Sequence, residues 1–361
     1  MFYFLHELKD FSIVFNIFRY ITFRSAAASI TAFMLSLWLG PMIILWLKSF
    51  NVTQNQKREY AEKIHSLYAH KEKVPTMGGV LIVLSVVLSS LLWGNLTNSF
   101  VWILILTTLG FGLVGFLDDW IKLRSKSSRG LTSFMKMFGQ LMIGVGIGLY
   151  LYMDPNFDKW LYLPFIKKGA FYLSFFFIPF VVLVLVGSSN ALNLTDGLDG
   201  LAIGCTLFTT VALAIIAYVT GRVDFASYLT LPYVPEAGEI TVVASALIGA
   251  SAGFLWFNCY PAEVMMGDTG SLSLGGILGA IAILIKKEFV LVIVGGIFVW
   301  EALSVMLQVA SFKIFHRRIF LMSPFHHHLQ LKGWPESKVT IRLWIIAMIL
   351  AVIGLSTLKV R

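Results

Sequence analysis

The sequence predicts an all-α integral membrane protein with ten transmembrane helices, and its composition and its apolar runs lead to this fold class. The chain of 361 residues is 58% hydrophobic, with a mean hydropathy of +0.82. Only 13% of its residues are charged, against roughly 25% in soluble domains. Ten apolar runs have lengths near the ~20 residues that cross a bilayer. We therefore expect a single polytopic membrane domain over residues 1–361.

The ten runs follow one another along the chain, separated by polar connections. They are expected near residues 21–47, 76–94, 99–117, 134–152, 170–187, 200–220, 241–258, 269–285, 289–312 and 340–358. The eighth run is short and rich in glycine. Glycine pairs four positions apart indicate close helix packing on three runs. These pairs are Gly144 and Gly148, Gly249 and Gly253, and Gly275 and Gly279. Glu301 lies inside the ninth run, and we interpret it as a hydrogen-bonding partner for a neighbouring helix, with a functional role as the alternative.

The distribution of lysine and arginine predicts the orientation. The connections between runs 1 and 2, 3 and 4, and 9 and 10 carry most of the 28 basic residues. By the positive-inside rule these connections are cytoplasmic, so both termini are expected to be periplasmic. The formal net charge of +9 then has a topological explanation, and we expect no nucleic-acid partner. The polar clusters described next all fall on the cytoplasmic side, where we expect the active site.

Adjacent acids, Asp118 and Asp119, end the third run. Anions are unfavourable at a helix C-terminus unless a cation or a basic group lies nearby. Lys122 follows within one turn and suits a phosphate group. A helix end that is simply solvated is the alternative interpretation of this motif.

Residues 188–200 form a strongly polar segment between two apolar runs. Its amide and carboxylate side chains lie beside two glycines and are those of Asn190, Asn193, Asp196 and Asp199. Such oxygens suit a hard cation such as Mg2+. Asp268 follows Gly267 just before the eighth run, and we expect it to be the leading metal ligand. Ordinary turn chemistry is the alternative for both segments.

Basic and imidazole groups accompany these acids. Lys71 precedes Pro75-Thr76-Met-Gly-Gly, a sequence that suggests an anion near a helix N-terminus, with a proline-initiated helix as the alternative. Three consecutive histidines, His326 to His328, can hold phosphate or metal. Together the motifs indicate Mg2+-dependent phosphoryl transfer at a membrane face, with one substrate from the cytosol and one from the bilayer.

These motifs resemble the phospho-N-acetylmuramoyl-pentapeptide-transferase family over essentially the whole chain. The resemblance rests on Pro75-Thr-Met-Gly-Gly, Asp118-Asp119, the segment 190–200, Phe254-Leu-Trp-Phe-Asn258, Met266-Gly-Asp268 and the tract His326–His328. The acidic elements are shared by the wider polyprenyl-phosphate N-acetylhexosamine-1-phosphate transferases. The histidine tract is more specific to the muramoyl branch.

The resemblance implies transfer of phospho-MurNAc-pentapeptide from UDP-MurNAc-pentapeptide to undecaprenyl phosphate, which gives lipid I and UMP. It also implies Mg2+, a ten-helix fold, a homodimer and a place in the bacterial inner membrane. By carry-over, the catalytic residues are Asp118, Asp119, Asp268 and His326, and the three acids are the metal ligands. The substrate-binding residues are Lys71, Thr76, Lys122, Lys136, Asn190, Asn193, Asp196, Asp199, Asn258, Met265, His327 and His328.

Within this assignment, Asp118 acts as the base that deprotonates the lipid phosphate. An Asp nucleophile with a covalent phospho-enzyme is the alternative, and both fit the residues present. Two positions depart from the family pattern. Met265 stands where the family has an aromatic residue suited to stacking on uracil, and Gln330 stands where it often has Glu.

Three other functions are the alternatives to this hypothesis. A sister transferase would move GlcNAc-1-phosphate to the same lipid, but the histidine tract disfavours it. A cation-coupled transporter would use mid-membrane acids and duplicated halves, and the chain contains no visible repeat. A lipid-binding scaffold would need no converging acids.

Overall fold

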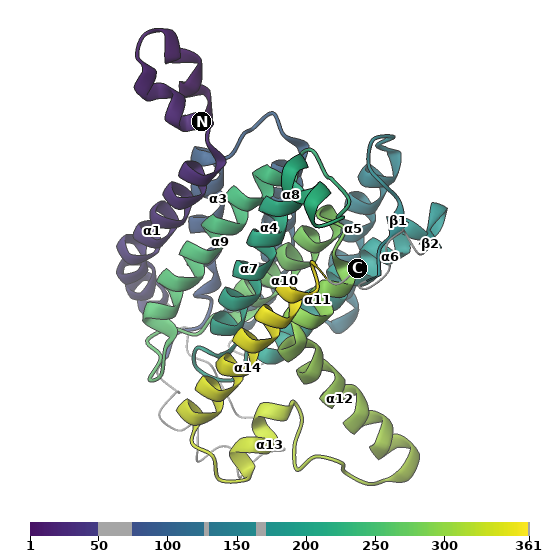
Figure 1. The fold of residues 1–361 in the computed structure, drawn as a ribbon. Coiled ribbons are helices and arrows are strands. Elements are labelled where there is room, and N and C mark those ends of the chain that lie inside the picture. Colours follow the sequence, from purple (N-terminus) through teal and green to yellow (C-terminus); the bar gives the residue numbers. More distant parts are fainter. Residues whose placement is uncertain (50–73, 126–129, 164–170, 360–361) are drawn as a thin grey trace.

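Long apolar helices make up most of the structure. The computed structural model describes residues 1–49, 74–125, 130–163 and 171–359. The long helices are α1 (Ile21–Ser49), α4 (Ser99–Arg124), α5 (Ser133–Met153), α6 (Phe177–Thr195), α7 (Leu201–Thr220), α9 (Ala237–Asn258), α10 (Gly267–Leu284), α12 (Gly296–Phe315) and α14 (Glu336–Ser356). Figure 1 shows them packed side by side as a bundle.

Shorter elements connect or flank these helices. The short α-helices are α3 (Gly79–Trp93), α8 (Val223–Tyr228), α11 (Glu288–Val294) and α13 (Phe325–Leu331). The 3-10 helices are η1 (Phe2–Asp10), η2 (Ile13–Arg19) and η4 (Ser174–Phe176). A small antiparallel ribbon pairs β1 (Trp160–Leu161) with β2 (Phe171–Tyr172).

Within the described residues, nine helices are long and apolar enough to cross a membrane. All ten predicted runs are helical, but two differ from the expectation. The second run corresponds to α3, which has 15 residues and is shorter than the usual span. The ninth run is divided at Gly295 into α11 and α12. The all-α membrane fold is therefore confirmed, whereas the count of ten spans stays a prediction.

The predicted glycine pairs lie where helices approach closely. A Cβ atom on Gly275 of α10 would lie 2.5 Å from the Ser188 carbonyl oxygen of α6. On α9, a Cβ atom on Gly249 would lie 1.9 Å from the Ser29 carbonyl oxygen of α1. Any larger side chain would force these helices apart, which is the role expected of small residues in membrane bundles. These contacts place α9 and α10 in the interior of the bundle.

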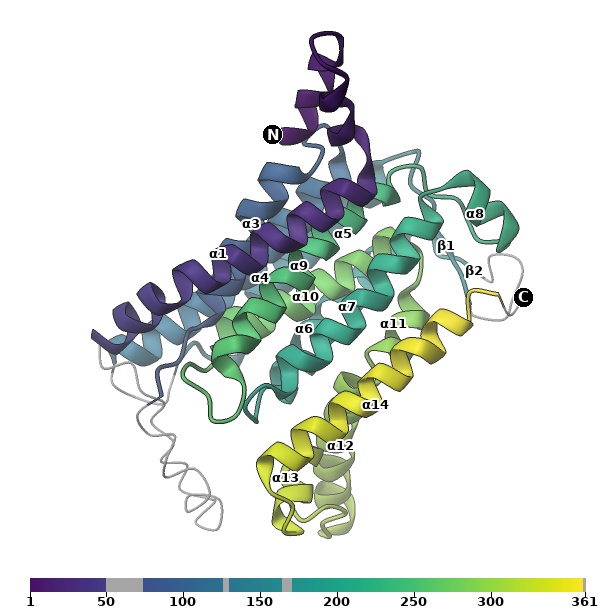
Figure 2. The ribbon, with the colours of Figure 1, turned by 60° about the vertical axis from the view of Figure 1, so that its left-hand side comes forward.

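Two ends of the bundle can be distinguished. The acidic end, defined by Asp118, Asn193 and Asp268, brings together the C-termini of α4 and α6 and the N-termini of α5 and α10. Helix α13 lies near this end as well. The start of α1 and the end of α7 lie at the other end, here called the opposite end (Figures 1 and 2).

Candidate active site

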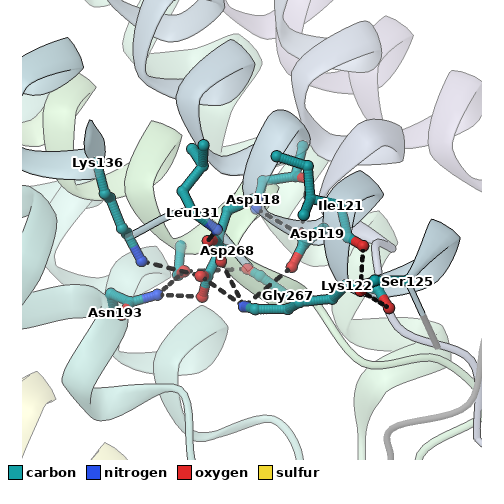
Figure 3. Close-up of polar contacts among 12 residues, drawn as sticks. Asp118, Asp119, Ile121, Lys122, Ser125, Leu131, Lys136, Asn193, Gly267 and Asp268 are labelled. Atoms are coloured by element: carbon teal, nitrogen blue, oxygen red, sulfur yellow. Dashed lines mark hydrogen bonds and ion pairs between the residues drawn. The ribbon is translucent and has the colours of Figure 1, made fainter. Parts of the chain in front are cut away.

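Three carboxylates from two helices meet at the acidic end (Figure 3). Asp118 and Asp119 lie in the last turns of α4, and Asp268 lies in the first turn of α10. One oxygen atom from each residue lies within 4.8 Å of the other two. Asp118 and Asp119 are only 3% and 4% exposed. Buried carboxylates at this separation repel one another, so they require nearby cations.

Two glycines allow α4 and α10 to approach so closely. A Cβ atom on Gly115 would lie 2.2 Å from the carbonyl oxygen of Asp268. Gly267 has a φ of +75°, in the left-handed region that favours glycine, and a Cβ atom there would lie 2.8 Å from Asp119 Oδ2. Position 267 therefore requires glycine for its backbone conformation and for the close approach of Asp119. The interpretation of this motif as a turn agrees with the first of these requirements.

Two lysines supply the positive charge inside the cluster. The Lys122 Nζ atom contacts Asp118 Oδ2 and lies 3.0 Å from Asp268 Oδ2 and 3.8 Å from Asp119 Oδ1. Lys136 Nζ, from the first turn of α5, lies 2.8 Å from Asp268 Oδ2. Three carboxylates against two ammonium groups leave one formal negative charge. The site therefore still favours an additional cation.

Hydrogen bonds orient the two carboxylates of α4. The Leu131 backbone N–H donates to Asp118 Oδ1 at 2.7 Å. The backbone N–H and the hydroxyl of Thr269 both donate to Asp119 Oδ2, at 2.9 and 2.8 Å. Thr269 was not among the residues predicted from the sequence, although it lies in the predicted Gly-Asp-Thr-Gly turn. A hydroxyl directly after a candidate metal ligand is the signal that could have identified it.

Asn193 links the polar segment of α6 to the cluster. Its side-chain amide donates to Asp268 Oδ1 at 2.8 Å and to the Ser271 hydroxyl oxygen at 2.7 Å. The structure thus brings together Asn193 and Asp268, two candidate residues from separate motifs. Asp196 lies three residues later, at the end of α6.

The donor set of the cluster fits a hard divalent cation. Its ligands would be carboxylate oxygens of Asp118, Asp119 and Asp268, which is the oxygen chemistry that Mg2+ and Ca2+ prefer. The ammonium group of Lys122 contacts all three residues, so a positive group already occupies the space between them. The acidic cluster therefore has the donor set for a metal ion, and such an ion would take the place of the Lys122 ammonium group.

The segment at the start of α3 pairs with the segment before α10. The Met265 N–H donates to the Pro75 carbonyl oxygen at 2.8 Å, and the Gly78 N–H donates to the Met265 carbonyl oxygen at 2.9 Å. This pairing places Thr76 beside the cluster, since a Cβ atom on Gly267 would lie 3.0 Å from its hydroxyl oxygen. The Met265 side chain is 5% exposed, so it offers little surface to a nucleobase. Lys71 lies outside the described residues.

His326 is buried on α13 and is held by Glu301 of α12. Its Nδ1 atom lies 3.2 Å from Glu301 Oε2, and its backbone N–H donates to the same oxygen at 3.4 Å. Its Nε2 atom faces the connection after α6, because a Cβ atom on Gly197 would lie 2.2 Å from it. Glu301 thus does bond a neighbouring helix, as the first interpretation held, and its partner is a candidate catalytic residue.

The other two histidines make local contacts. The Nδ1 atom of His327 lies 3.0 Å from Gln330 Oε1. His328 stacks on the Phe325 ring with centroids 5.6 Å apart, and its Nδ1 atom accepts the Leu321 N–H at 3.1 Å. Partial burial, helped by the nearby charge of Lys332, lowers the pKa of His328. This ring is therefore neutral where it braces the segment before α13.

Three further predicted residues brace the connections around the site. The Asn190 amide donates to Gln140 Oε1 at 2.8 Å and joins α6 to α5. Asp199 Oδ2 accepts the Ala262 N–H at 3.0 Å. The Asn258 amide donates to the Val264 carbonyl oxygen at 2.8 Å, while its side-chain oxygen accepts the N–H of Gly200. These bonds give the three residues structural roles, and their contact with substrate stays a prediction.

Comparisons with known proteins agree with this geometry. A model of glycosyl transferase family 4 matches residues 101–286, about half of the chain, and this range includes Asp118, Asp119 and Asp268. The phospho-N-acetylmuramoyl-pentapeptide-transferase of Citrifermentans bemidjiense is 48% identical over 361 residues, covering 100% of each chain. The protein of that name from Thermodesulfovibrio yellowstonii is 48% identical over 360 residues, covering 99% of each chain.

A third relative, from Oleidesulfovibrio alaskensis, carries the same name and is 48% identical over 362 residues, covering 100% of each chain. The matches extend over whole chains and so cover the segments that carry the acidic cluster, the histidine tract and the long helices. The chain therefore belongs to the phospho-N-acetylmuramoyl-pentapeptide-transferase family, within the glycosyl transferases of family 4.

Proposed function

We propose that the chain transfers phospho-MurNAc-pentapeptide from UDP-MurNAc-pentapeptide to undecaprenyl phosphate and so forms lipid I and UMP. One structural observation carries this proposal. Asp118, Asp119 and Asp268 meet Lys122 and Lys136 at one end of an apolar bundle, where a diphosphate from water and a phosphate from the bilayer can reach the same groups. The membership of the chain in this family supports the identity of the two substrates.

In the reaction, an oxygen of undecaprenyl phosphate attacks the phosphorus atom attached to MurNAc. A new P–O bond forms, the bond to the UMP oxygen breaks, and UMP leaves with the bonding electrons. Asp118 accepts the proton of the lipid phosphate when that oxygen is protonated, and its bond from the Leu131 N–H keeps the carboxylate oriented. A two-step route through a phosphorylated Asp is the alternative.

The basic groups stabilise the phosphates. Lys122 and Lys136 leave their contacts with the carboxylates and contact oxygens of the diphosphate instead. Negative charge develops on these oxygens as UMP departs. Asp268, Asp118 and Asp119 would hold a Mg2+ ion, which when bound would neutralise charge on the same diphosphate. Asn193 keeps Asp268 in place through its 2.8 Å bond to Oδ1.

We assign the acidic end to the cytoplasmic face of the bacterial inner membrane, with ten spans in a single domain and both termini in the periplasm. Lysine and arginine enrichment supports this orientation. Cys259 tests it, because this thiol is exposed beside the acidic end, while the other cysteine, Cys205, is buried. An impermeant thiol reagent should label Cys259 in inverted vesicles only. Labelling in intact cells would reverse the assignment. We also propose a homodimer.

The activity is tested with purified full-length protein in detergent, undecaprenyl phosphate and Mg2+, with either UDP-MurNAc-pentapeptide or UDP-GlcNAc in parallel reactions. UMP release from the muramoyl substrate alone, abolished by EDTA, is the expected result. Release from UDP-GlcNAc alone would assign the chain to the sister reaction. Folded protein that releases UMP from neither substrate would contradict the proposal.

A further inference from the structure

A polar cavity lies at the opposite end of the bundle, away from the acidic cluster. It has a volume of about 370 Å³. Residues at the end of η2 and the start of α1 line it, together with the last turn of α7 and the connection from α7 to α8. The polar lining residues are Asn16, Arg19, Tyr20, Thr22, Tyr218 and Arg222. Two arginines thus line one cavity, and guanidinium groups bind phosphate well.

The described residues offset the positive charge of this cavity only weakly. Among the residues that the structure describes, the Arg19 side chain makes no hydrogen bond or ion pair. Arg222 donates to the Tyr218 hydroxyl at 3.2 Å, and its carboxylate neighbour, Asp224, lies 3.7 Å away with a side chain that is 84% exposed. An exposed pair at that distance contributes little.

Glu239, a buried acid of the first turn of α9, is already paired with another arginine. Both carboxylate oxygens of Glu239 accept hydrogen bonds from Arg24, at 2.6 and 2.7 Å, one turn into α1. Glu239 therefore balances Arg24 and leaves the charge of Arg19 free. The start of α1 also lines the cavity through Ile21 and Thr22, and the positive end of a helix dipole favours an anion.

Close backbone contacts build the cavity. A Cβ atom on Gly221, at the end of α7, would lie 2.4 Å from the Gly238 nitrogen of α9. A Cβ atom on Gly238 would lie 2.8 Å from Ile21 Cδ1 of α1. The first turn of α9 thus holds the end of α7 against the start of α1. This contact brings Arg222 to the same cavity as Arg19, although the two residues lie far apart in the sequence.

The surroundings of the cavity are apolar and exposed. Ile17 of η2 is 40% exposed, and Val223, Phe225 and Tyr228 of α8 are 59%, 43% and 72% exposed. Figure 2 shows α8 projecting beside the bundle at this end and η2 above the start of α1. Apolar side chains next to tyrosines and arginines are typical of the boundary between hydrocarbon and headgroups.

We propose that this cavity binds the phosphate group of an anionic phospholipid, with Arg19 and Arg222 contacting the phosphate oxygens. The exposed side chains of η2 and α8 then lie against the acyl chains. Neither arginine contributes to the acidic cluster, so this is a second site. One lipid bound there contacts both the first turn of α1 and the end of α7. Free inorganic phosphate offers the same oxygen atoms to the two arginines, so the experiment must distinguish it from a lipid phosphate.

The experiment uses native mass spectrometry of the full-length protein. The protein is incubated in detergent with phosphatidylglycerol, phosphatidylcholine or inorganic phosphate in separate samples and is then released from the detergent. Arg19→Gln and Arg222→Gln remove one charge each from the cavity. Lys9→Gln is the matched control, because Lys9 is an exposed cation of η1 outside the cavity. UMP release by each variant shows that the acidic end remains folded.

We expect the wild type and Lys9→Gln each to retain one more phosphatidylglycerol molecule than Arg19→Gln or Arg222→Gln. The affinity for phosphatidylglycerol should be at least tenfold weaker in each arginine variant. Equal retention by all four proteins would overturn the site. Equal retention of phosphatidylcholine would overturn its selectivity for anionic lipid. Retention of inorganic phosphate in place of lipid, lost in both arginine variants, would overturn the lipid assignment.

Discussion

Glu301 Oε2 lies 3.2 Å from His326 Nδ1, and both side chains are buried between α12 and α13. The same carboxylate oxygen accepts the His326 backbone N–H at 3.4 Å, so Glu301 anchors the start of α13. An acceptor this close to Nδ1 favours the tautomer that carries its proton there. The other ring nitrogen, Nε2, then points toward Gly197, four residues after Asn193. Glu301 thereby acts as a positioning residue for an imidazole at the edge of the proposed site.

Replacing Glu301 with Gln should lower the turnover number about tenfold, because an uncharged amide no longer holds the ring in one tautomer. Loss of one buried charge-assisted hydrogen bond costs roughly 1.5–3 kcal/mol. A tenfold lower rate requires that about 1.4 kcal/mol of this loss be felt in the transition state. UMP release as a function of UDP-MurNAc-pentapeptide concentration measures it. KM should change less than kcat.

The matched control is Glu288→Gln, which makes the same change in a buried glutamate between α10 and α12 at the opposite end. This variant should retain near-normal kcat. If both variants lose turnover equally, the effect comes from general destabilisation, and the positioning role of Glu301 is wrong.

Asp268→Asn should abolish Mg2+-dependent turnover while the protein still folds. Asp268 accepts bonds from Lys122, Lys136 and Asn193, and an amide in its place keeps the shape but removes the charge that holds the cation. A loss of more than ~1000-fold in kcat is expected for a principal metal ligand, about 4 kcal/mol. Melting curves in detergent check folding. Asp224→Asn, an exposed acid at the opposite end, should retain full turnover.

Asp118→Asn should reduce kcat far more than the affinity for the UDP substrate. A general base acts in the chemical step, and its removal typically costs ~100- to 10,000-fold in rate. Calorimetric titration with UDP-MurNAc-pentapeptide measures the affinity separately from UMP release. Equal losses of affinity and rate would instead assign Asp118 to substrate or metal binding.

The stability of the segment before α13 should depend on pH through His328. Its Nδ1 atom must be unprotonated to accept the Leu321 N–H, and burial lowers its pKa below the ordinary value near 6.5. The bond therefore stabilises the fold above that pH and is lost as the pH falls through the lowered pKa. Melting temperature should fall more from pH 8 to pH 5 in the wild type than in His328→Gln. An identical fall in both would contradict this role.

The helices and the acidic cluster were largely predictable from the sequence. Runs of ~20 apolar residues have few alternatives to a helix in a bilayer, because backbone groups must bond internally. Polar residues at the ends of such runs must lie at a membrane face, so Asp118, Asn193 and Asp268 could be expected together. Lys136 was expected only from the family, because a single lysine at a helix start has no distinctive pattern.

Pairings between distant residues could not be predicted in this way. Glu301 lies in an apolar run and His326 in a polar tract, and no spacing rule joins an α12 side chain to α13. The break at Gly295 was also missed, because a glycine inside an apolar run is common in membrane helices. Such features depend on how neighbouring helices pack, which periodicity does not encode.

The ion pair of Arg24 and Glu239 gives a final prediction about stability at the opposite end. Arg24 is 1% exposed and donates to both oxygens of Glu239, which also accepts the Asn95 N–H at 3.0 Å. Arg24→Met should leave Glu239 buried and unpaired, a loss of about 3–5 kcal/mol. The melting temperature should fall by roughly 10 °C, with kcat of the folded protein unchanged.

The double variant Arg24→Met, Glu239→Gln separates the two causes of this loss. Gln can still accept the Asn95 N–H but carries no charge, so the double variant should melt well above Arg24→Met alone. The recovery measures the cost of the unpaired carboxylate, as in a double-mutant cycle. If the two variants melt at the same temperature, the loss lies in the packing of the Arg24 side chain, and the buried charge of Glu239 contributes little.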